Sequence, residues 1–98
     1  MITKNLSILG STGSIGTQSL EVIRNNPERF KVEALTCGAN AELLSEQIKE
    51  FRPALAVTGS EEDALRLSKE FPGTEFAWGR EGLIAAAEGG CDMVLNSL

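Results

Sequence analysis

A glycine-rich stretch that follows a short apolar run and precedes a helical pattern constrains the fold of this chain more than any other feature. Gly10, Gly13 and Gly16 come directly after the apolar run that ends at Leu9. In such a place the first glycine permits a tight turn, the second lets the backbone approach a pyrophosphate, and the third allows close packing of a helix on a strand. The stretch therefore predicts a strand, a phosphate-binding turn and a helix in direct succession.

The glycine-rich turn also offers hydrogen-bond donors to an anion. The backbone N–H groups of Ser14 and Ile15 are expected at the start of the helix, where the helix dipole favours negative charge. Thr12 and Ser14 add hydroxyl groups. The turn lacks the sequence G-K-[ST] that would mark a P-loop. The pattern indicates a dinucleotide fingerprint of the form G-x-x-G-x-x-G, with a glycine-rich turn that binds nothing as the alternative.

Short apolar runs alternate with amphipathic segments along the rest of the chain. Apolar runs bounded by turn residues predict strands at residues 5–9, 32–37, 54–57, 75–78 and 93–95. Helices are predicted between them, the first over residues 14–25 with an apolar face of Ile15, Leu20, Val22 and Ile23. Strands and helices in this alternation favour βαβ units, so we expect an α/β fold with a Rossmann-like, doubly wound parallel sheet in three αβα layers. Because the chain stops at Leu98, just after an apolar strand, we expect the domain to be incomplete and the chain to be a fragment.

The segment after the second predicted strand bears on the choice between NAD and NADP. An NAD site usually places a carboxylate there, against the 2′-hydroxyl of the ribose. This chain instead has Gly38, Ala39 and Asn40, with no carboxylate to repel a 2′-phosphate. Gly38 and the start of the next helix, which Asn40 can cap, offer backbone N–H donors. The sequence therefore favours NADP, with a plain helix cap as the alternative role of Asn40.

Composition argues against several classes of protein. The net charge is −5 and the lysines and arginines are scattered singly, so no basic stripe predicts nucleic-acid binding. No apolar run reaches the roughly 18 to 20 residues of a membrane span, and the first residues lack the apolar region of a secretory signal, so we expect a soluble cytoplasmic protein. The chain has no histidine to act as a base or metal ligand. Cys37 and Cys91 are expected to be small buried apolar side chains.

The stretch "LGSTGSIGTQSLEVIRNNPERFKVEALTCGAN", residues 9–40, closely resembles the N-terminus of the 1-deoxy-D-xylulose 5-phosphate reductoisomerases. In that family a GSTGSIG turn, a helix ending N-P-x-x-F, a strand and a G-x-N loop follow in this order. The similarity continues through "EFRP" at residues 50–53 to "CDMVLNSL" at the end, so it covers the chain. The resemblance implies that NADPH is bound by Thr12, Gly13, Ser14 and Ile15 at its phosphates, after the turn at Gly10, and by Gly38, Ala39 and Asn40 at the adenosine ribose and its 2′-phosphate.

The resemblance also implies an activity. Enzymes of this family rearrange the sugar phosphate with a divalent metal, Mg or Mn, and reduce the product with NADPH to 2-C-methyl-D-erythritol 4-phosphate for non-mevalonate isoprenoid synthesis. They are homodimers and the target of fosmidomycin. Their metal-binding carboxylates and substrate-binding segments lie further along than this chain reaches. We therefore expect residues 1–98 to be the N-terminal part of the NADPH-binding domain, without the catalytic and C-terminal domains, without a catalytic residue and without a metal ligand.

One sequence feature and the function itself are open to other interpretations. Glu61, Glu62 and Asp63 could suggest a metal site, but acidic side chains at a helix start complement the helix dipole, and that structural role is the expected one. Another NADP enzyme, such as a semialdehyde dehydrogenase with a G-A-T-G-x-V-G turn, is an alternative function, against which Ser11 and Ile15 argue. A non-enzymatic nucleotide-sensing module is the second alternative.

Overall fold

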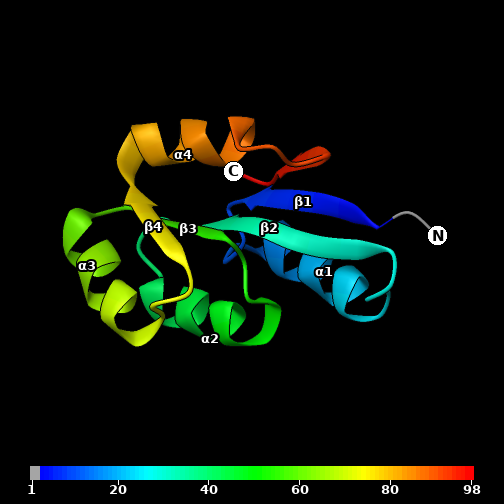
Figure 1. Ribbon diagram of the computed structural model, residues 1–98, viewed down its shortest axis with the longest axis horizontal. Coiled ribbons are helices and arrows are strands. Elements are labelled where there is room, and N and C mark those ends of the chain that lie inside the picture. Colours follow the sequence, from blue (N-terminus) through cyan, green and yellow to red (C-terminus); the bar gives the residue numbers. More distant parts are fainter. Residues whose placement is uncertain (1–2) are drawn as a thin grey trace.

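The computed structural model describes residues 3–98, which form a five-stranded sheet with helices on both faces (Figure 1). Along the chain the elements are β1 (Lys4–Leu9), α1 (Ser14–Arg24), β2 (Phe30–Thr36), α2 (Ala41–Phe51), β3 (Leu55–Thr58), α3 (Glu61–Glu70), β4 (Glu75–Trp78), α4 (Gly79–Glu88) and β5 (Met93–Asn96). The strand order is β4-β3-β2-β1-β5, and every neighbouring pair is parallel. The predicted α/β class and doubly wound parallel sheet are confirmed.

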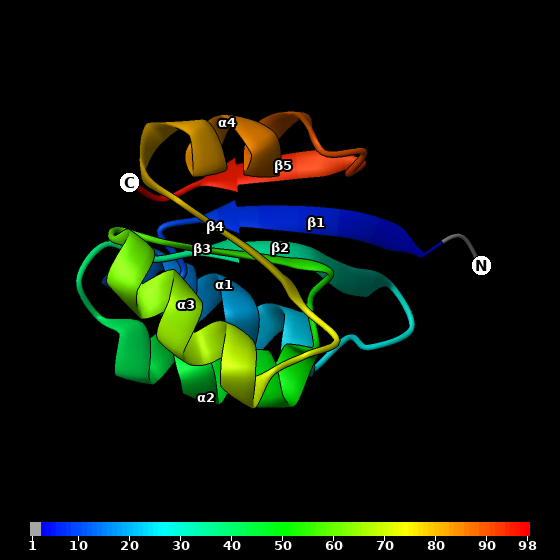
Figure 2. The same cartoon turned by 60° about the vertical axis from the view of Figure 1, so that its left-hand side comes forward.

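Three layers result from the way the strands are connected. Helices α1, α2 and α3 cover one face of the sheet, and α4 covers the other (Figure 2). The connection through α4 carries the chain from β4 at one edge to β5 at the other, past β3, β2 and β1. The connections that leave β1 and enter β5 therefore lie on opposite faces, so a topological switch point falls between these two strands. In open α/β sheets, ligands bind at the carboxyl ends of the strands at such a point.

The main core lies between the sheet and the helices α1 to α3. Ile8, Leu35, Leu44, Ile48 and Ala56 are among its members, each with no exposed surface. A smaller cluster on the α4 side contains Leu9, Ala34, Val57 and Ala86. The side chains of consecutive strand residues thus point to alternate faces, as a sheet covered on both sides requires.

The apolar face predicted for the first helix is partly wrong. Ile15 and Val22 are 64% and 57% exposed. The buried positions of α1 are Gly16, Leu20 and Ile23, at spacings of four and three residues. Leu20 and Ile23 are buried as predicted. Hydrophobic periodicity missed the first buried position because it is a glycine, which packs closely by having no side chain.

The second strand begins two residues earlier than predicted and ends one residue earlier. Phe30 and Lys31 extend the ladder because they pair with Lys4 and Asn5 of β1. Between Leu6 and Ser7 the register with β2 shifts, which marks an irregularity in the ladder. Strand pairing therefore sets these boundaries, whereas the apolar run alone located only the middle of the strand.

The helix cap predicted at Asn40 is confirmed, a similar cap is found at Ser60, and one of the cysteine predictions is wrong. The Asn40 side-chain oxygen accepts a hydrogen bond from Leu43 N (3.1 Å), and the Ser60 hydroxyl accepts one from Asp63 N (3.2 Å). Cys37 is buried as expected, but Cys91 is only partly buried, because it lies in the loop before the edge strand β5. Within residues 3–98, no helix is both long and apolar enough to span a membrane.

Candidate functional site

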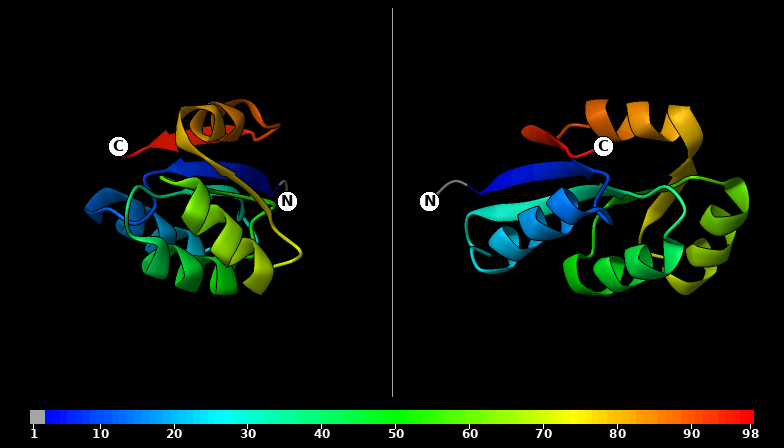
Figure 3. Two further views of the ribbon diagram at one scale, coloured as in Figure 1. Left: turned by 90° about the vertical axis from the view of Figure 1, so that its left-hand side faces the viewer. Right: turned by 180° about the vertical axis from the view of Figure 1, so that it is seen from behind.

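The glycine-rich turn lies at the carboxyl end of β1, beside the switch point between β1 and β5 (Figure 3). Gly10 has a φ of +80°, in the left-handed region that favours glycine. A Cβ atom on Gly16 would overlap the Gly10 carbonyl oxygen and lie 2.7 Å from Ser11 Cα. Ser97, just after β5, donates from its hydroxyl to Leu9 O (2.6 Å). The structure thus has the tight turn at Gly10 and the close helix packing at Gly16 that the sequence predicts.

The N-terminus of α1 is free to bind an anion. Its N-cap residue, Gly13, has no side chain to cap the helix, and its first turn contains no acidic residue. The N–H groups of Ser14, Ile15 and Gly16 have no hydrogen-bond acceptor among residues 3–98. These donors lie at the positive end of the helix dipole, where phosphate groups bind in many proteins. The N-termini of α2 and α3, by contrast, each have a side-chain cap.

Neither the backbone conformation nor the packing of this chain requires a glycine at position 13. Its φ of −80° is open to any residue, and the nearest atom to a Cβ built on it would be Gly10 O at an ordinary 3.6 Å. The missing side chain therefore leaves room in front of α1, which is the space that a phosphate group would need. Thr12 and Ser14 flank Gly13 in the chain, Thr12 half-buried and Ser14 exposed.

A buried polar network that sequence analysis missed holds the turn in place. The Ser11 hydroxyl lies within hydrogen-bond distance of two acceptors, Gln47 Oε1 (2.7 Å) and the Thr36 carbonyl oxygen (3.1 Å), while Gln47 Nε2 donates to the Ser11 carbonyl oxygen (2.8 Å). Thr36 Oγ1 accepts from Gly10 N (2.8 Å). Ser11 and Gln47 are 0% and 6% exposed, so the network joins the turn to β2 and α2. No local pattern in the sequence points to this network, because Ser11 and Gln47 lie 36 positions apart.

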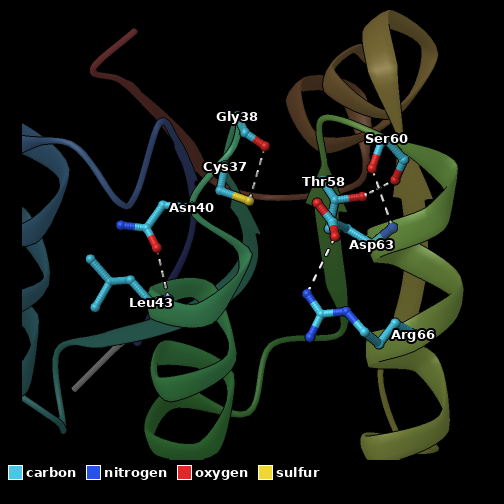
Figure 4. A network of polar contacts seen from close by, with 8 residues as sticks. All are labelled: Cys37, Gly38, Asn40, Leu43, Thr58, Ser60, Asp63 and Arg66. Carbon is cyan, nitrogen blue, oxygen red and sulfur yellow. Dashed lines mark hydrogen bonds and ion pairs between the residues drawn. The ribbon is translucent and has the colours of Figure 1, made fainter.

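The ends of β2 and β3 form a second part of the site. Gly59 N donates to Gly38 O (3.1 Å), and a Cβ atom on Gly59 would come within 2.7 Å of that oxygen. This close approach of two loops surrounds a hollow of about 300 Å³ that is lined by Gly38, Ala39, Gly59, Ser60 and Asp63. Asn40, the next residue along the chain, caps α2 (Figure 4) and does not line the hollow. The structure therefore places Gly38 and Ala39 of the predicted segment in the lining of a recess, but not Asn40.

The hollow contains a carboxylate, contrary to what the sequence led us to expect. Asp63 lines it from the first turn of α3, and its Oδ1 lies 3.3 Å from Nη2 of Arg66. The prediction considered only the residues that follow β2, whereas this carboxylate arrives from the helix after β3. Burial, and secondly the charge of Asp63, raise the pKa of the Cys37 thiol to about 11. The negative charge of Asp63 thus acts on the end of β2.

The family model for 1-deoxy-D-xylulose 5-phosphate reductoisomerase matches residues 6–98. This chain belongs to the 1-deoxy-D-xylulose 5-phosphate reductoisomerase family. Reductoisomerases of Shouchella clausii and Chlamydia caviae are 54% and 50% identical to it, over 81 and 88 residues. These alignments cover 82% and 89% of this chain but 21% and 23% of the two relatives. The chain therefore spans less than a quarter of the length of these relatives.

Solved reductoisomerase structures share the fold described above. A crystal structure of a reductoisomerase in complex with NADPH, fosmidomycin and magnesium is 33% identical and has a TM-score of 0.90, covering 97% of this chain and 24% of that one. The reductoisomerase from Zymomonas mobilis in complex with NADPH is 30% identical, with a TM-score of 0.87 over 95% of this chain and 25% of that one. The resemblance inferred from the sequence is thus confirmed, and membership of this family displaces the semialdehyde dehydrogenase alternative.

The described residues of this reductoisomerase family member offer no metal site. Among residues 3–98, no three His, Cys, Asp or Glu side chains lie close enough together to hold a metal ion. Glu61, Glu62 and Asp63 occupy the first turn of α3, where they complement the helix dipole. The groups present in these residues therefore do not fit a divalent metal.

Proposed function

We propose that this chain is the NADPH-binding part of a 1-deoxy-D-xylulose 5-phosphate reductoisomerase. The complete enzyme would rearrange and reduce 1-deoxy-D-xylulose 5-phosphate to 2-C-methyl-D-erythritol 4-phosphate in non-mevalonate isoprenoid synthesis. The observation that carries the proposal is the uncapped N-terminus of α1, with three free N–H groups behind the turn at Gly10. The reductoisomerases solved with NADPH, at 33% and 30% identity, support the choice of nucleotide.

The residues present fit an NADPH molecule that lies along the carboxyl edge of the sheet. In this proposal the N–H groups of Ser14 and Ile15 and the hydroxyl of Thr12 hold the pyrophosphate, with the space at Gly13 admitting it. The loop of Gly38, Ala39 and Asn40 holds the adenosine ribose. NADPH, when bound, supplies a hydride. What residues 1–98 contribute is binding and orientation, and we place the catalytic groups and the ligands for Mn or Mg in other parts of the enzyme.

The buried network behind the turn explains how these residues stay ready to bind. Ser11, Thr36 and Gln47 fix the turn to β2 and α2 before nucleotide arrives. A site that is already ordered loses little conformational entropy on binding. Little of the binding free energy from the N–H donors of α1 is therefore spent on ordering the turn.

The proposal includes the partners and location expected from the sequence. The full enzyme would take a small sugar phosphate as substrate, be inhibited by fosmidomycin, and act as a homodimer in the cytoplasm. Sedimentation of the full-length protein tests the dimer: a mass of two chains supports it, and a single-chain mass at assay concentration contradicts it.

The first experiment measures NADPH oxidation by the full-length protein that carries this chain. The reaction contains 1-deoxy-D-xylulose 5-phosphate and Mn, with NADH in place of NADPH and omission of metal as controls. Consumption of NADPH that requires both substrate and metal supports the proposed activity. Nucleotide binding without turnover would contradict it and favour a nucleotide-sensing module, while absence of NADPH binding would also remove the assignment of the site.

A further inference from the structure

The hollow at the ends of β2 and β3 has an unusual charge for a site that faces a phosphate. Asp63 is the one charged residue among the five that line it. A phosphate group placed beside an unpaired carboxylate would be repelled. If the ribose of NADPH lies at Gly38 and Ala39, as the proposed function has it, the 2′-phosphate and Asp63 must share this region.

Arg66 brings a positive charge next to the hollow through its contact with Asp63, although Arg66 itself does not line the hollow. It follows Asp63 by one turn of α3, and its Nη2 lies 3.3 Å from Asp63 Oδ1. Figure 4 shows the Arg66 side chain extending from α3 back toward this carboxylate. The Arg66 side chain is 56% exposed and that of Asp63 is 27% exposed, so the guanidinium stays open to solvent while its partner is mostly covered.

The contact with Asp63 leaves most of the guanidinium available. Arginine has five N–H donors in a planar fork, and the contact within the described residues is from Nη2 to a single carboxylate oxygen. A guanidinium can bind a carboxylate and a phosphate together, and its fork suits phosphate geometry. Asp63 would then act by holding Arg66 at the hollow.

We propose that Arg66, positioned by Asp63, binds the 2′-phosphate of NADPH and gives the site its preference for NADPH over NADH. Ala39, the predicted contact on the β2 side, carries no charge, so the selecting charge comes from α3. This inference rests on the proposed function, because it assumes that the adenosine ribose lies at Gly38 and Ala39. It adds a specificity-determining residue that the sequence analysis did not identify.

The test compares the affinities of the full-length protein for NADPH and NADH by fluorescence titration. Arg66→Gln should weaken NADPH binding by about tenfold to a hundredfold, as expected when a charge-assisted hydrogen bond is removed, and leave NADH binding within about twofold. Lys69→Gln is the matched control, since Lys69 is an exposed cation on the same helix, one turn further from the hollow. It should leave both affinities unchanged. Arg66→Lys should restore part of the NADPH affinity.

Other outcomes would overturn the inference in distinguishable ways. Equal NADPH affinities for Arg66→Gln and Lys69→Gln would show that Arg66 does not bind the 2′-phosphate, while the proposed function would stand. Tighter NADH than NADPH binding by the unaltered protein, lost in Asp63→Ala, would show that Asp63 accepts a ribose hydroxyl instead. No binding of either nucleotide by the unaltered protein would overturn the proposed function and this inference with it. Circular dichroism of each variant confirms its fold.

Discussion

Gly13 and Gly16 are both glycines of the same turn, but Gly16 is needed for the packing of α1 and Gly13 is not. Gly16→Ala would place a methyl group 2.7 Å from Ser11 Cα, so the free energy of unfolding should fall by about 1–3 kcal/mol or more, as in overpacked cores. Gly13→Ala meets no atom closer than 3.6 Å and should cost less than about 1 kcal/mol. Urea denaturation of both variants measures this difference.

The same pair of variants separates stability from binding. Gly13→Ala fills the space in front of α1, so NADPH affinity should fall about tenfold while the fold is retained. If Gly13→Ala binds NADPH as tightly as the unaltered protein, the pyrophosphate does not occupy this space. If Gly16→Ala is as stable as the unaltered protein, α1 can move away from the turn without lowering the free energy of unfolding.

Cys37 should make stability depend on pH in the alkaline range. Its pKa in the folded protein, about 11, lies above the ordinary value of 9.0, chiefly because of burial and secondly because of Asp63. Well below pH 9 the Cys37 thiol is protonated in both states, and the free energy of unfolding does not depend on it. Between pH 9 and about 11 the unfolded chain loses the proton first, so the free energy of unfolding falls, by at most about 1.4 kcal/mol per pH unit from this group.

Denaturation at several pH values, compared with Cys37→Ala, isolates this contribution. The variant should lose less stability between pH 9 and 11, because it lacks the Cys37 thiol and the two proteins share every other titratable group. Identical pH profiles would mean that Cys37 ionises as easily in the folded state as in the unfolded one. The absence of tyrosine from the sequence removes another group that titrates in this range.

At the scale of elements, Gln47 links α2 to the nucleotide-binding turn. Gln47→Leu keeps the volume of the side chain but removes the donor to Ser11 O and the acceptor for the Ser11 hydroxyl. The Ser11 hydroxyl can still donate to the Thr36 carbonyl oxygen, but the buried Ser11 carbonyl oxygen loses its Gln47 partner. Leaving it unpaired costs about 1–3 kcal/mol, so the midpoint of urea denaturation and the NADPH affinity should both fall. Gln18→Leu on the exposed surface of α1 is the control. A Gln47→Leu protein with unchanged NADPH affinity would show that the network does not hold the turn for binding.

Sequence analysis predicted those parts of the site that depend on neighbouring residues. The turn at Gly10, the packing at Gly16 and the cap at Asn40 follow from local backbone chemistry, and the structure has all three. The contacts of Gln47 with Ser11 join residues 36 positions apart. Such pairs are set by how α2 packs on the sheet, so no local pattern reveals them. The same holds for Asp63, which the prediction overlooked because it reaches the hollow from a different helix.

At the scale of the whole molecule, the sheet has an open edge at β5. This strand is hydrogen-bonded to β1 on one side, and its other side is not paired within residues 3–98. Met93 and Val94 are 44% and 37% exposed, and the strand contains no lysine or proline that would discourage pairing. The opposite edge strand, β4, carries the charged residue Glu75. The 98-residue chain should therefore self-associate through β5 as its concentration rises.

Val94→Lys should lower this self-association, because a charge on an edge strand disfavours pairing with another strand. Leu65→Lys is the matched control: it adds the same charge at an apolar side chain that is 56% exposed, but on α3 and away from the sheet edge. Sedimentation velocity over a range of concentrations should give a smaller average mass for Val94→Lys than for the unaltered chain or Leu65→Lys. An equal decrease of the average mass in both variants would point to non-specific apolar association. Val94 lies on an edge strand with unpaired backbone groups, whereas Leu65 lies on a helix, so strand pairing predicts a decrease for Val94→Lys alone.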